Sequence, residues 1–164
     1  MNRLYLLRHG IAVPPGTEGY EDDDRPLTSK GERRTRQVAQ GLRRLRLKLD
    51  RIISSPLPRA LRTAELVAET LDIEFLVETD DALRPGNSAP SIREWLTTRS
   101  EPRLMLVGHD PSFSELIGLL ATGQPNPHIC ELRKGGIAAF RDYPDGSLRL
   151  DWLARPRLLR RLLR

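Results

Sequence analysis

The sequence has almost no cysteine and lacks long apolar runs. Cys130 is the one cysteine among 164 residues, which excludes an intrachain disulfide and a cysteine-based zinc site within one chain. No apolar run reaches the roughly 18–20 residues of a membrane-spanning helix. The first ten residues, MNRLYLLRHG, contain too short an apolar stretch for a signal peptide and no small-residue cleavage site. We therefore expect a cytoplasmic protein without a membrane span.

Acidic residues are outnumbered, 22 against 27 lysines and arginines, which gives a formal net charge of +5. The imbalance is local, because residues 155–164 contain five arginines and no acid. The rest of the chain carries equal numbers of both signs, and it does not interleave aromatic with basic residues. These features argue against a nucleic-acid partner.

The chain length predicts a single domain at residues 1–154, followed by a basic amphipathic tail at residues 155–164. The leucines of the tail can form one helical stripe with arginines opposite. Two interpretations stay open, a helix that docks on the domain or frays from it, and contact with an acidic partner or a membrane surface. The shortness of the segment favours the first.

Short apolar runs alternate with segments of helical periodicity. The predicted strands span residues 3–7, 51–54, 73–77, 103–107, 137–141 and 147–153. The predicted helix starts are the capping-box spacing Ser29–Glu32, the prolines Pro56 and Pro58, Ser88, and Asp110 with Pro111 as N-cap and N1. This alternation predicts an α/β layer fold with a largely parallel sheet and one antiparallel edge.

Similar chemistry follows three of the predicted strands. Arg8 and His9 follow the first strand, Arg59 lies one turn into the helix after the second, and His109 follows the fourth. Ligands bind outside the carboxyl ends of parallel strands, so these side chains are expected to meet at one edge. Guanidinium groups and helix N-termini both suit phosphate, which predicts an anion site. Gly10 would leave room for a phosphate to approach the backbone.

The histidines suggest more than binding. A neutral imidazole can accept a phosphoryl group covalently, whereas a binding module needs cations only. The charges of Arg8 and Arg59 would lower the pKa of His9 and keep its ring neutral. By contrast, Arg62 is expected to be a solvated helix residue and His128 an ordinary loop residue.

Three segments taken together resemble the histidine phosphatase superfamily, which has the phosphoglycerate-mutase-like fold. They are Leu7–Gly10, Ser54–Ala64 (SSPLPRALRTA) and Val107–Pro111 (VGHDP), and Arg25-Pro26-Leu27-Thr28-x-x-Gly31 is similar to the SixA-type phosphohistidine phosphatases. The resemblance implies an α/β three-layer sandwich with a mostly parallel sheet and one antiparallel edge strand.

The resemblance also implies roles for individual residues. His9 is expected to be the nucleophile that becomes phosphohistidine, Arg8 and Arg59 to clamp the phosphoryl group, and His109 to stabilise charge on the same oxygens. Gly10 is expected in the substrate-binding set. The implied reaction needs neither a metal nor another cofactor.

One departure concerns the general acid. Many superfamily members place a glutamate after the third strand, where this chain has Ala82. Asp80, Asp81 or the acidic run at 21–24 are the uncertain substitutes. The absence of a carboxylate at 82 fits a labile phosphorus–nitrogen bond, which needs less protonation of its leaving group than an alkyl ester.

The chain also lacks the insertion that forms a lid in larger members, so we expect an open site, which suits a phosphohistidine-bearing protein substrate in a phosphorelay. We also expect a monomer. Two alternatives stay open: a small-molecule phosphomonoesterase of the same superfamily, and a non-catalytic phosphate-binding module.

Overall fold

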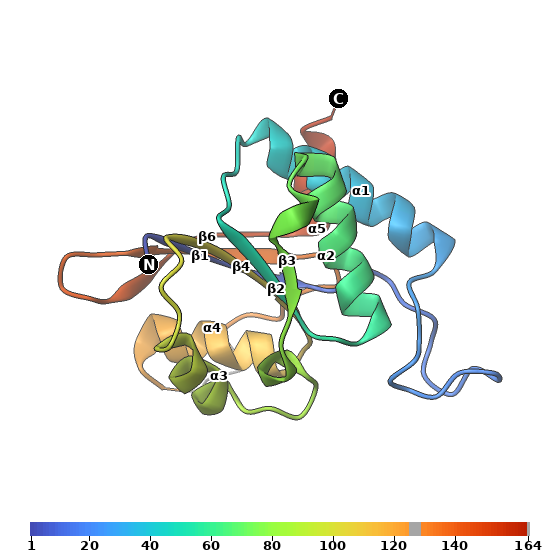
Figure 1. The fold of residues 1–164 in the computed structure, drawn as a ribbon, viewed down its shortest axis with the longest axis horizontal. Helices are drawn as coiled ribbons and strands as arrows, with labels where there is room; N and C mark the ends of the chain where they lie inside the picture. The colour runs from blue at the N-terminus through green and yellow to red at the C-terminus, as the bar shows by residue number, and fades with distance from the viewer. Residues whose placement is uncertain (125–128, 164) are drawn as a thin grey trace.

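The computed structural model describes residues 1–124 and 129–163, which form a six-stranded sheet with helices on both faces (Figure 1). The strands are β1 (Arg3–Arg8), β2 (Arg51–Ser54), β3 (Val77–Thr79), β4 (Arg103–Gly108), β5 (Ile137–Asp142) and β6 (Leu148–Ala154). The α-helices are α1 (Ser29–Arg44), α2 (Pro58–Leu71), α3 (Ala89–Leu96), α4 (Ser112–Thr122) and α5 (Pro156–Arg161). Two 3-10 helices, η1 (Glu74–Leu76) and η2 (Asp81–Leu83), flank β3.

The strand order is β3-β2-β4-β1-β5-β6, and β1 to β4 pair in parallel. At one edge, β5 pairs antiparallel with both β1 and β6. The predicted fold class, a three-layer α/β sandwich with a mostly parallel sheet, is confirmed. Because β1, β2 and β4 point the same way, their carboxyl ends share one edge of the sheet.

Alternating side chains of the central strands supply two separate cores. Leu4 and Leu6 of β1 pack with α3 and α4, which lie below the sheet in Figure 1. Tyr5 and Leu7 pack with α1, α2 and α5 above it. Burial on both faces fixes the ends of β1 and β4 in place, which is what a precisely shaped site requires.

The strand predicted at residues 73–77 is displaced. The structure forms η1 there, with Phe75 exposed, and β3 begins only at Val77. β3 is a short edge strand with one neighbour, β2, and the register Ile52 to Val77 fixes where pairing can begin. The apolar residues of the 73–77 run are therefore divided between two elements, because the 3-10 turn η1 that follows α2 includes residues 74–76.

Two helix starts also differ from the prediction by one residue. The N-cap of α1 is Thr28, whose hydroxyl accepts a hydrogen bond from the Gly31 amide at 2.9 Å, whereas Ser29 is the first helical residue. The N-cap of α4 is Pro111, and the carboxylate of Asp110 accepts hydrogen bonds from Ser114. In both cases, the neighbouring polar side chain caps the helix.

The tail forms α5, which packs against α1. Leu159 is buried, and its backbone lies directly over Gly41 of α1. No helix in the part of the chain that the structure describes is long and apolar enough to cross a membrane. His128, predicted to be a loop residue, lies outside the described residues.

Candidate active site

Strand register brings the two candidate histidines together. Arg8 of β1 pairs with Gly108 of β4, so His9 and His109 are the next residues on neighbouring strands. The His9 amide donates to the Gly108 carbonyl at 3.0 Å. The two imidazole centroids are 5.2 Å apart, and both side chains are almost completely buried. The predicted meeting of His9 and His109 at the carboxyl edge is therefore observed.

A backbone hydrogen bond defines which nitrogen of His9 is free. The Nδ1 atom lies 2.7 Å from the Gly10 carbonyl oxygen, which can only accept, so Nδ1 carries the proton. In the neutral ring, Nε2 then has the unshared electron pair. Burial, followed by the charges of His109, Arg59 and Arg8, lowers the pKa of His9 to about 3. The ring is therefore neutral at physiological pH.

The side chain of His109 is held in place by a residue that follows the neighbouring strand β2. Its Nε2 lies 2.9 Å from the hydroxyl of Ser55, a fully buried residue of the Ser54–Ala64 segment. Burial and then the charges of Arg59, Arg8 and Arg25 lower the pKa of His109 to about 3. Ser55 orients the ring, a role that the sequence analysis did not assign to it.

Arg8 and Arg59 both have a buried Nε that finds no hydrogen-bond partner among the described residues. Arg8 donates from Nη1 to the Leu132 carbonyl at 2.7 Å and lies 3.7 Å from Asp110. Arg59 donates from Nη1 to the Asp22 carbonyl at 2.8 Å. Burial lowers the pKa of Arg59, although a guanidinium keeps its charge at any physiological pH. Unpaired buried donors are costly, so this arrangement favours an anion.

The loop between β1 and α1 contributes two residues that the sequence analysis did not single out as site residues. Arg25 is buried and donates to the Asp22 carboxylate at 2.9 Å and to the Val13 carbonyl at 2.7 Å. The hydrogen bond from Arg25 lowers the pKa of Asp22. Asp22 also lies 3.8 Å from Arg59. In the sequence, the one sign that Arg25 belongs to the site is its place in the Arg-Pro-Leu-Thr segment. Asp22 is distinguished there only as a member of the acidic run at 21–24.

Gly10 has a structural reason to be glycine. A Cβ at this position would collide with the hydroxyl of Thr35, and the Gly10 amide donates to Thr63 at 3.0 Å. The Gly10 amide is already hydrogen-bonded within the protein. Close packing of the segment after β1 against α1 and α2 therefore explains why residue 10 is glycine. Its contribution to substrate binding stays a prediction.

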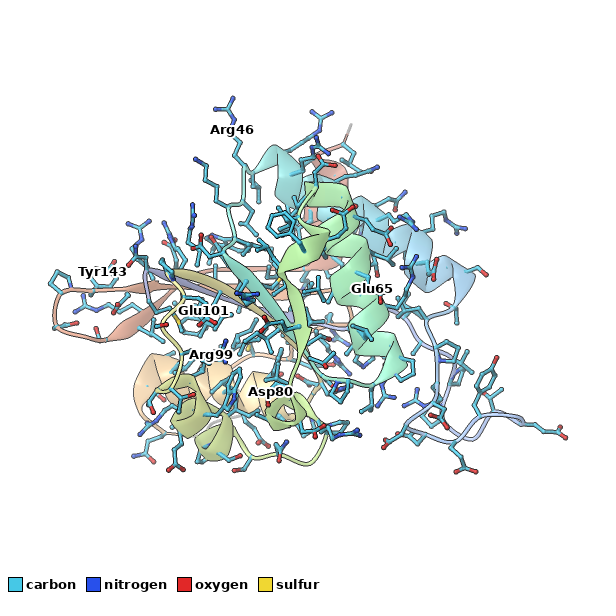
Figure 2. The ribbon with its side chains drawn as sticks, in the orientation of Figure 1. Arg46, Glu65, Asp80, Arg99, Glu101 and Tyr143 are labelled. Carbon is cyan, nitrogen blue, oxygen red and sulfur yellow. The ribbon has the colours of Figure 1, made fainter. Side chains whose placement is uncertain are left out.

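The candidate general acids are not equally placed. Both carboxylate oxygens of Asp80 are occupied, by the Ala82 amide at 2.8 Å and the Trp95 indole at 3.1 Å. Figure 2 labels Asp80 on the segment after β3. Asp81 is exposed and pairs with Arg84. Of the three candidates, only the 21–24 run lies against Arg59, through Asp22, whose lowered pKa makes it a poor proton donor at neutral pH.

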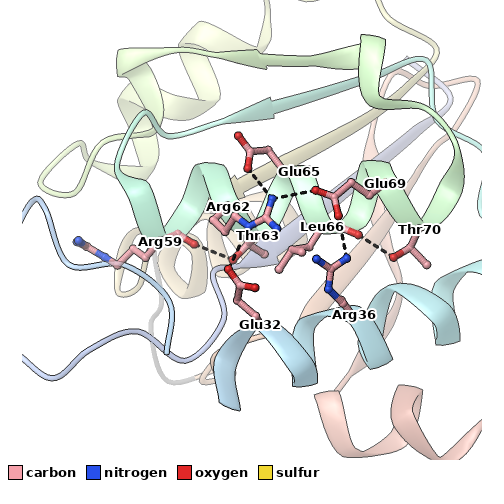
Figure 3. A network of polar contacts seen from close by, with 9 residues as sticks. All are labelled: Glu32, Arg36, Arg59, Arg62, Thr63, Glu65, Leu66, Glu69 and Thr70. Atoms are coloured by element: carbon pink, nitrogen blue, oxygen red, sulfur yellow. Dashed lines mark hydrogen bonds and ion pairs between the residues drawn. The ribbon is translucent and has the colours of Figure 1, made fainter. Parts of the chain in front are cut away.

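Arg62, one turn after Arg59, has a different environment (Figure 3). It binds three carboxylates, those of Glu32, Glu65 and Glu69, at 2.8 to 3.1 Å. These hydrogen bonds outweigh burial and raise its pKa, and the bond to Glu32 ties α2 to α1. The prediction that Arg62 is only a solvated helix residue is wrong, because three carboxylates bind its guanidinium group. The guanidinium of Arg62 is saturated within the protein, whereas the buried Nε of Arg59 has no partner among the described residues.

Among the described residues, no group of three or more His, Cys, Asp or Glu side chains is arranged to hold a metal ion. The charged groups that converge on the histidines are mainly guanidinium groups.

Comparison with known proteins agrees with this geometry. The model of the histidine phosphatase superfamily (branch 1) matches residues 4–86, which include His9 and Arg59. An uncharacterised protein of Picosynechococcus is 40% identical over 141 residues, 84% of each chain. The chain belongs to the histidine phosphatase superfamily. Among relatives of this histidine phosphatase, the phosphohistidine phosphatase SixA of Escherichia coli K12 is 26% identical over 94% of both chains.

Other relatives carry different names. A probable phosphoglycerate mutase, GpmB of Cronobacter sakazakii, is 34% identical over 90% of this chain, which spans only 66% of that protein. The solved structure of the protein histidine phosphatase SixA complexed with tungstate has a TM-score of 0.81, with 24% identity, and covers 96% of this chain and 99% of its own. That likeness shows a shared fold.

Proposed function

We propose that this histidine phosphatase hydrolyses phosphohistidine on a phosphorelay or phosphotransfer protein, through a phosphorylated His9. One observation carries the proposal: the buried, neutral His9 lies beside His109, near two arginines whose Nε donors find no partner among the described residues. A phosphoryl group supplies the acceptors that these donors need, and its phosphorus would then lie within reach of an imidazole electron pair.

In the first step, the electron pair of His9 Nε2 attacks phosphorus and a new nitrogen–phosphorus bond forms. The bond between phosphorus and the substrate imidazole breaks, and that imidazole leaves with the electron pair and takes a proton from solvent. The proton stays on Nδ1 of His9 and is donated to the Gly10 carbonyl throughout, which orients the ring and stabilises its phosphorylated form.

Arg8, Arg59 and His109 act on the oxygens of the transferred group. The guanidinium groups bind the charge that spreads over these oxygens in the transition state. In the second step, water attacks phosphorus, the bond to His9 breaks, and the electron pair returns to Nε2. One proton of the water stays on the released hydrogenphosphate and the other passes to solvent, so atoms and charge balance without a metal ion.

The choice of phosphohistidine as the substrate rests on the three candidate general acids, none of which is placed to donate a proton to the leaving group. Ala82 offers no proton, Asp80 is bound by an amide and an indole, and Asp22 is held ionised by Arg25. A phosphorus–nitrogen bond tolerates this arrangement better than an alkyl ester, whose alkoxide must be protonated as it leaves. The similarity to the phosphohistidine phosphatase SixA of Escherichia coli supports the same choice.

A small-molecule phosphomonoesterase of the same superfamily is the second candidate, favoured by the similarity to the probable phosphoglycerate mutase GpmB. A phosphate-binding module without turnover is the third. The geometry of His9 argues against it, because binding needs no buried neutral imidazole.

The deciding assay compares a phosphohistidine-bearing protein with an aryl phosphate ester, each with and without a chelator, for the wild type and His9→Ala. We expect hydrolysis of phosphohistidine that is insensitive to the chelator and absent from the variant. Hydrolysis of the ester alone would support the second candidate, and tight phosphate binding without turnover would support the third. Activity that survives His9→Ala would remove the proposed nucleophile.

A further inference from the structure

Unpaired cations gather on one part of the molecule. Among the described residues, the lysines and arginines that make no ion pair lie on α1, in the loop after it, or on α5 and its N-cap Arg155, with Arg93 and Lys134 as exceptions. Burial, followed by the charges of Arg34 on α1 and Arg157 on α5, lowers the pKa of Arg160. This surface therefore carries cations that repel one another, and among the described residues no carboxylate forms an ion pair with them.

The leucines of α5 and of the turn that follows it divide into two stripes. Leu159 and Leu163 lie four residues apart on the side that packs toward α1, and Leu159 is 2% exposed. Leu158 and Leu162 form the second stripe, and they are 54% and 40% exposed. Docking of α5 on the domain accounts for the first stripe only, so the second stripe needs another explanation.

These features meet where α1 and α5 end, at the top of Figure 1. Leu163 lies against Arg43 and Arg44 at the end of α1, and Leu45 there is 49% exposed. Arg46 projects away from the body in Figure 2. We call this region the basic–leucine corner, and it consists of Arg44, Leu45, Arg46, Lys48, Arg157, Leu158, Arg161 and Leu162.

The end of α1 in the corner is remote from the candidate active site, whereas α5 begins nearer to it, at Pro156 beside Gly135, whose amide donates to the His9 carbonyl. α1 starts beside that site, where the Thr28 amide bonds to the Ile11 carbonyl, and it runs for 16 residues to the corner. At 1.5 Å per residue, this helix separates the α1 end of the corner from the site by about 24 Å. A bilayer against the end of α1 and the last turn of α5 therefore does not touch the phosphoryl group.

We propose that the basic–leucine corner binds the surface of an anionic lipid bilayer. Exposed leucines can enter the boundary between headgroups and acyl chains, while arginines beside them reach the lipid phosphates. Three leucines bury too little apolar surface to hold the protein on a neutral membrane, so binding depends on anionic lipid and is sensitive to salt.

The composition of the corner argues against other occupants. A second copy of this chain would bring two sets of unpaired cations together. A nucleic acid would cover the leucines without aromatic side chains there for its bases to stack on. An acidic protein is distinguished from a bilayer by the experiment below.

The test is cosedimentation of the full chain with vesicles of phosphatidylcholine mixed with phosphatidylglycerol, and with vesicles of phosphatidylcholine alone. We expect binding only to the anionic vesicles, at about 0.1 M salt and not at about 1 M. Arg157→Gln/Arg161→Gln should weaken binding about 25-fold, since each cation near an anionic bilayer contributes roughly fivefold. Leu158→Ser/Leu162→Ser should also weaken it.

The matched control is Arg93→Gln/Arg141→Gln, which removes the same charge at exposed positions outside the corner. It should retain binding, and hydrolysis of an aryl phosphate and thermal unfolding show that each variant is folded. Vesicle binding does not depend on the proposed phosphatase activity, so the two can fail separately. The proposal is overturned by absence of binding to anionic vesicles or by an equal loss in the control. Binding to polyglutamate but not to vesicles would assign the corner to an acidic protein instead.

Discussion

At the scale of single residues, environment separates two arginines that look alike in the sequence. Arg59 and Arg62 lie one turn apart on α2. Arg62 is saturated by three carboxylates, whereas the buried Nε of Arg59 has no partner in the part of the chain that the structure describes. The first joins two helices, and we propose that the second binds the substrate.

This contrast predicts different consequences of the same substitution. Arg59→Ala should lower kcat/KM by roughly 10²–10³, the usual effect of losing one donor to a transition-state oxyanion. Arg62→Ala should leave kcat/KM nearly unchanged and lower the melting temperature, because the bonds within α2 and the bond from α2 to α1 are lost. Steady-state kinetics and thermal unfolding of both variants measure this, and equal kinetic losses would contradict the assigned roles.

The two histidines predict how stability depends on pH. Their pKa values near 3 in the fold lie below the value of about 6.5 expected for the unfolded chain, which therefore binds more protons between these limits. Stability should fall as pH decreases through that window, by about 2 kcal/mol per histidine between pH 6.5 and 5. Urea unfolding of the wild type and His9→Gln at both pH values tests this. The variant should lose less stability on acidification, and an identical loss would show that His9 is not held neutral.

Sequence reasoning found the residues at strand ends and missed those that reach the site through a loop. His9, Arg8 and His109 follow strands, so parallel pairing alone brings them to one edge. Asp22 and Arg25 belong to a segment without periodicity, and only their contacts with Arg59 and Val13 reveal their position. Ser55 was visible in the motif, but its bond to His109 needs the register between β2 and β4.

At the scale of secondary structure, the displaced elements share a cause. The apolar run at 73–77 and the cap at Ser29 were judged from local patterns, whereas the structure selects Val77 and Thr28 through pairing with β2 and with Ile11. Local patterns identify an element, and its neighbours in space decide where it begins.

The contact between α1 and α5 depends on a glycine. A Cβ at Gly41 would collide with the backbone of Leu159, so Gly41→Ala should push α5 away and destabilise the fold by about 1–3 kcal/mol. Hydrogen exchange should show faster exchange at residues 156–161, with kcat unchanged. Gln40→Ala, at the exposed neighbouring position, is the matched control. Unaltered exchange in Gly41→Ala would contradict this packing.

At the scale of the whole molecule, the surplus positive charge is distinct from the candidate catalytic chemistry. The excess positive charge lies in residues 155–164. The structure lays that segment along α1, where it begins beside Gly135 at Pro156 and leads away from the histidines. We propose that residues 1–154 form the phosphatase domain and that the tail stabilises it by covering Gly41 and burying Leu159.

Removal of residues 155–164 should therefore leave a folded, active domain of lower stability. The loss of the buried Leu159 side chain alone should cost about 1.5–3 kcal/mol. Urea unfolding and hydrolysis of an aryl phosphate by the shortened chain measure both effects. If the shortened chain folded but lost its activity, the tail would belong to the catalytic unit and the proposed boundary would be wrong.

The central claim is that His9 carries the phosphoryl group during turnover. Rapid acid-free quenching of the enzyme with a phosphohistidine-bearing protein, followed by peptide mass spectrometry, tests it most directly. We predict an acid-labile phosphate on His9 in the wild type and none in His9→Ala. Turnover without a phosphorylated enzyme, or a phosphate found on His109 instead, would contradict the account.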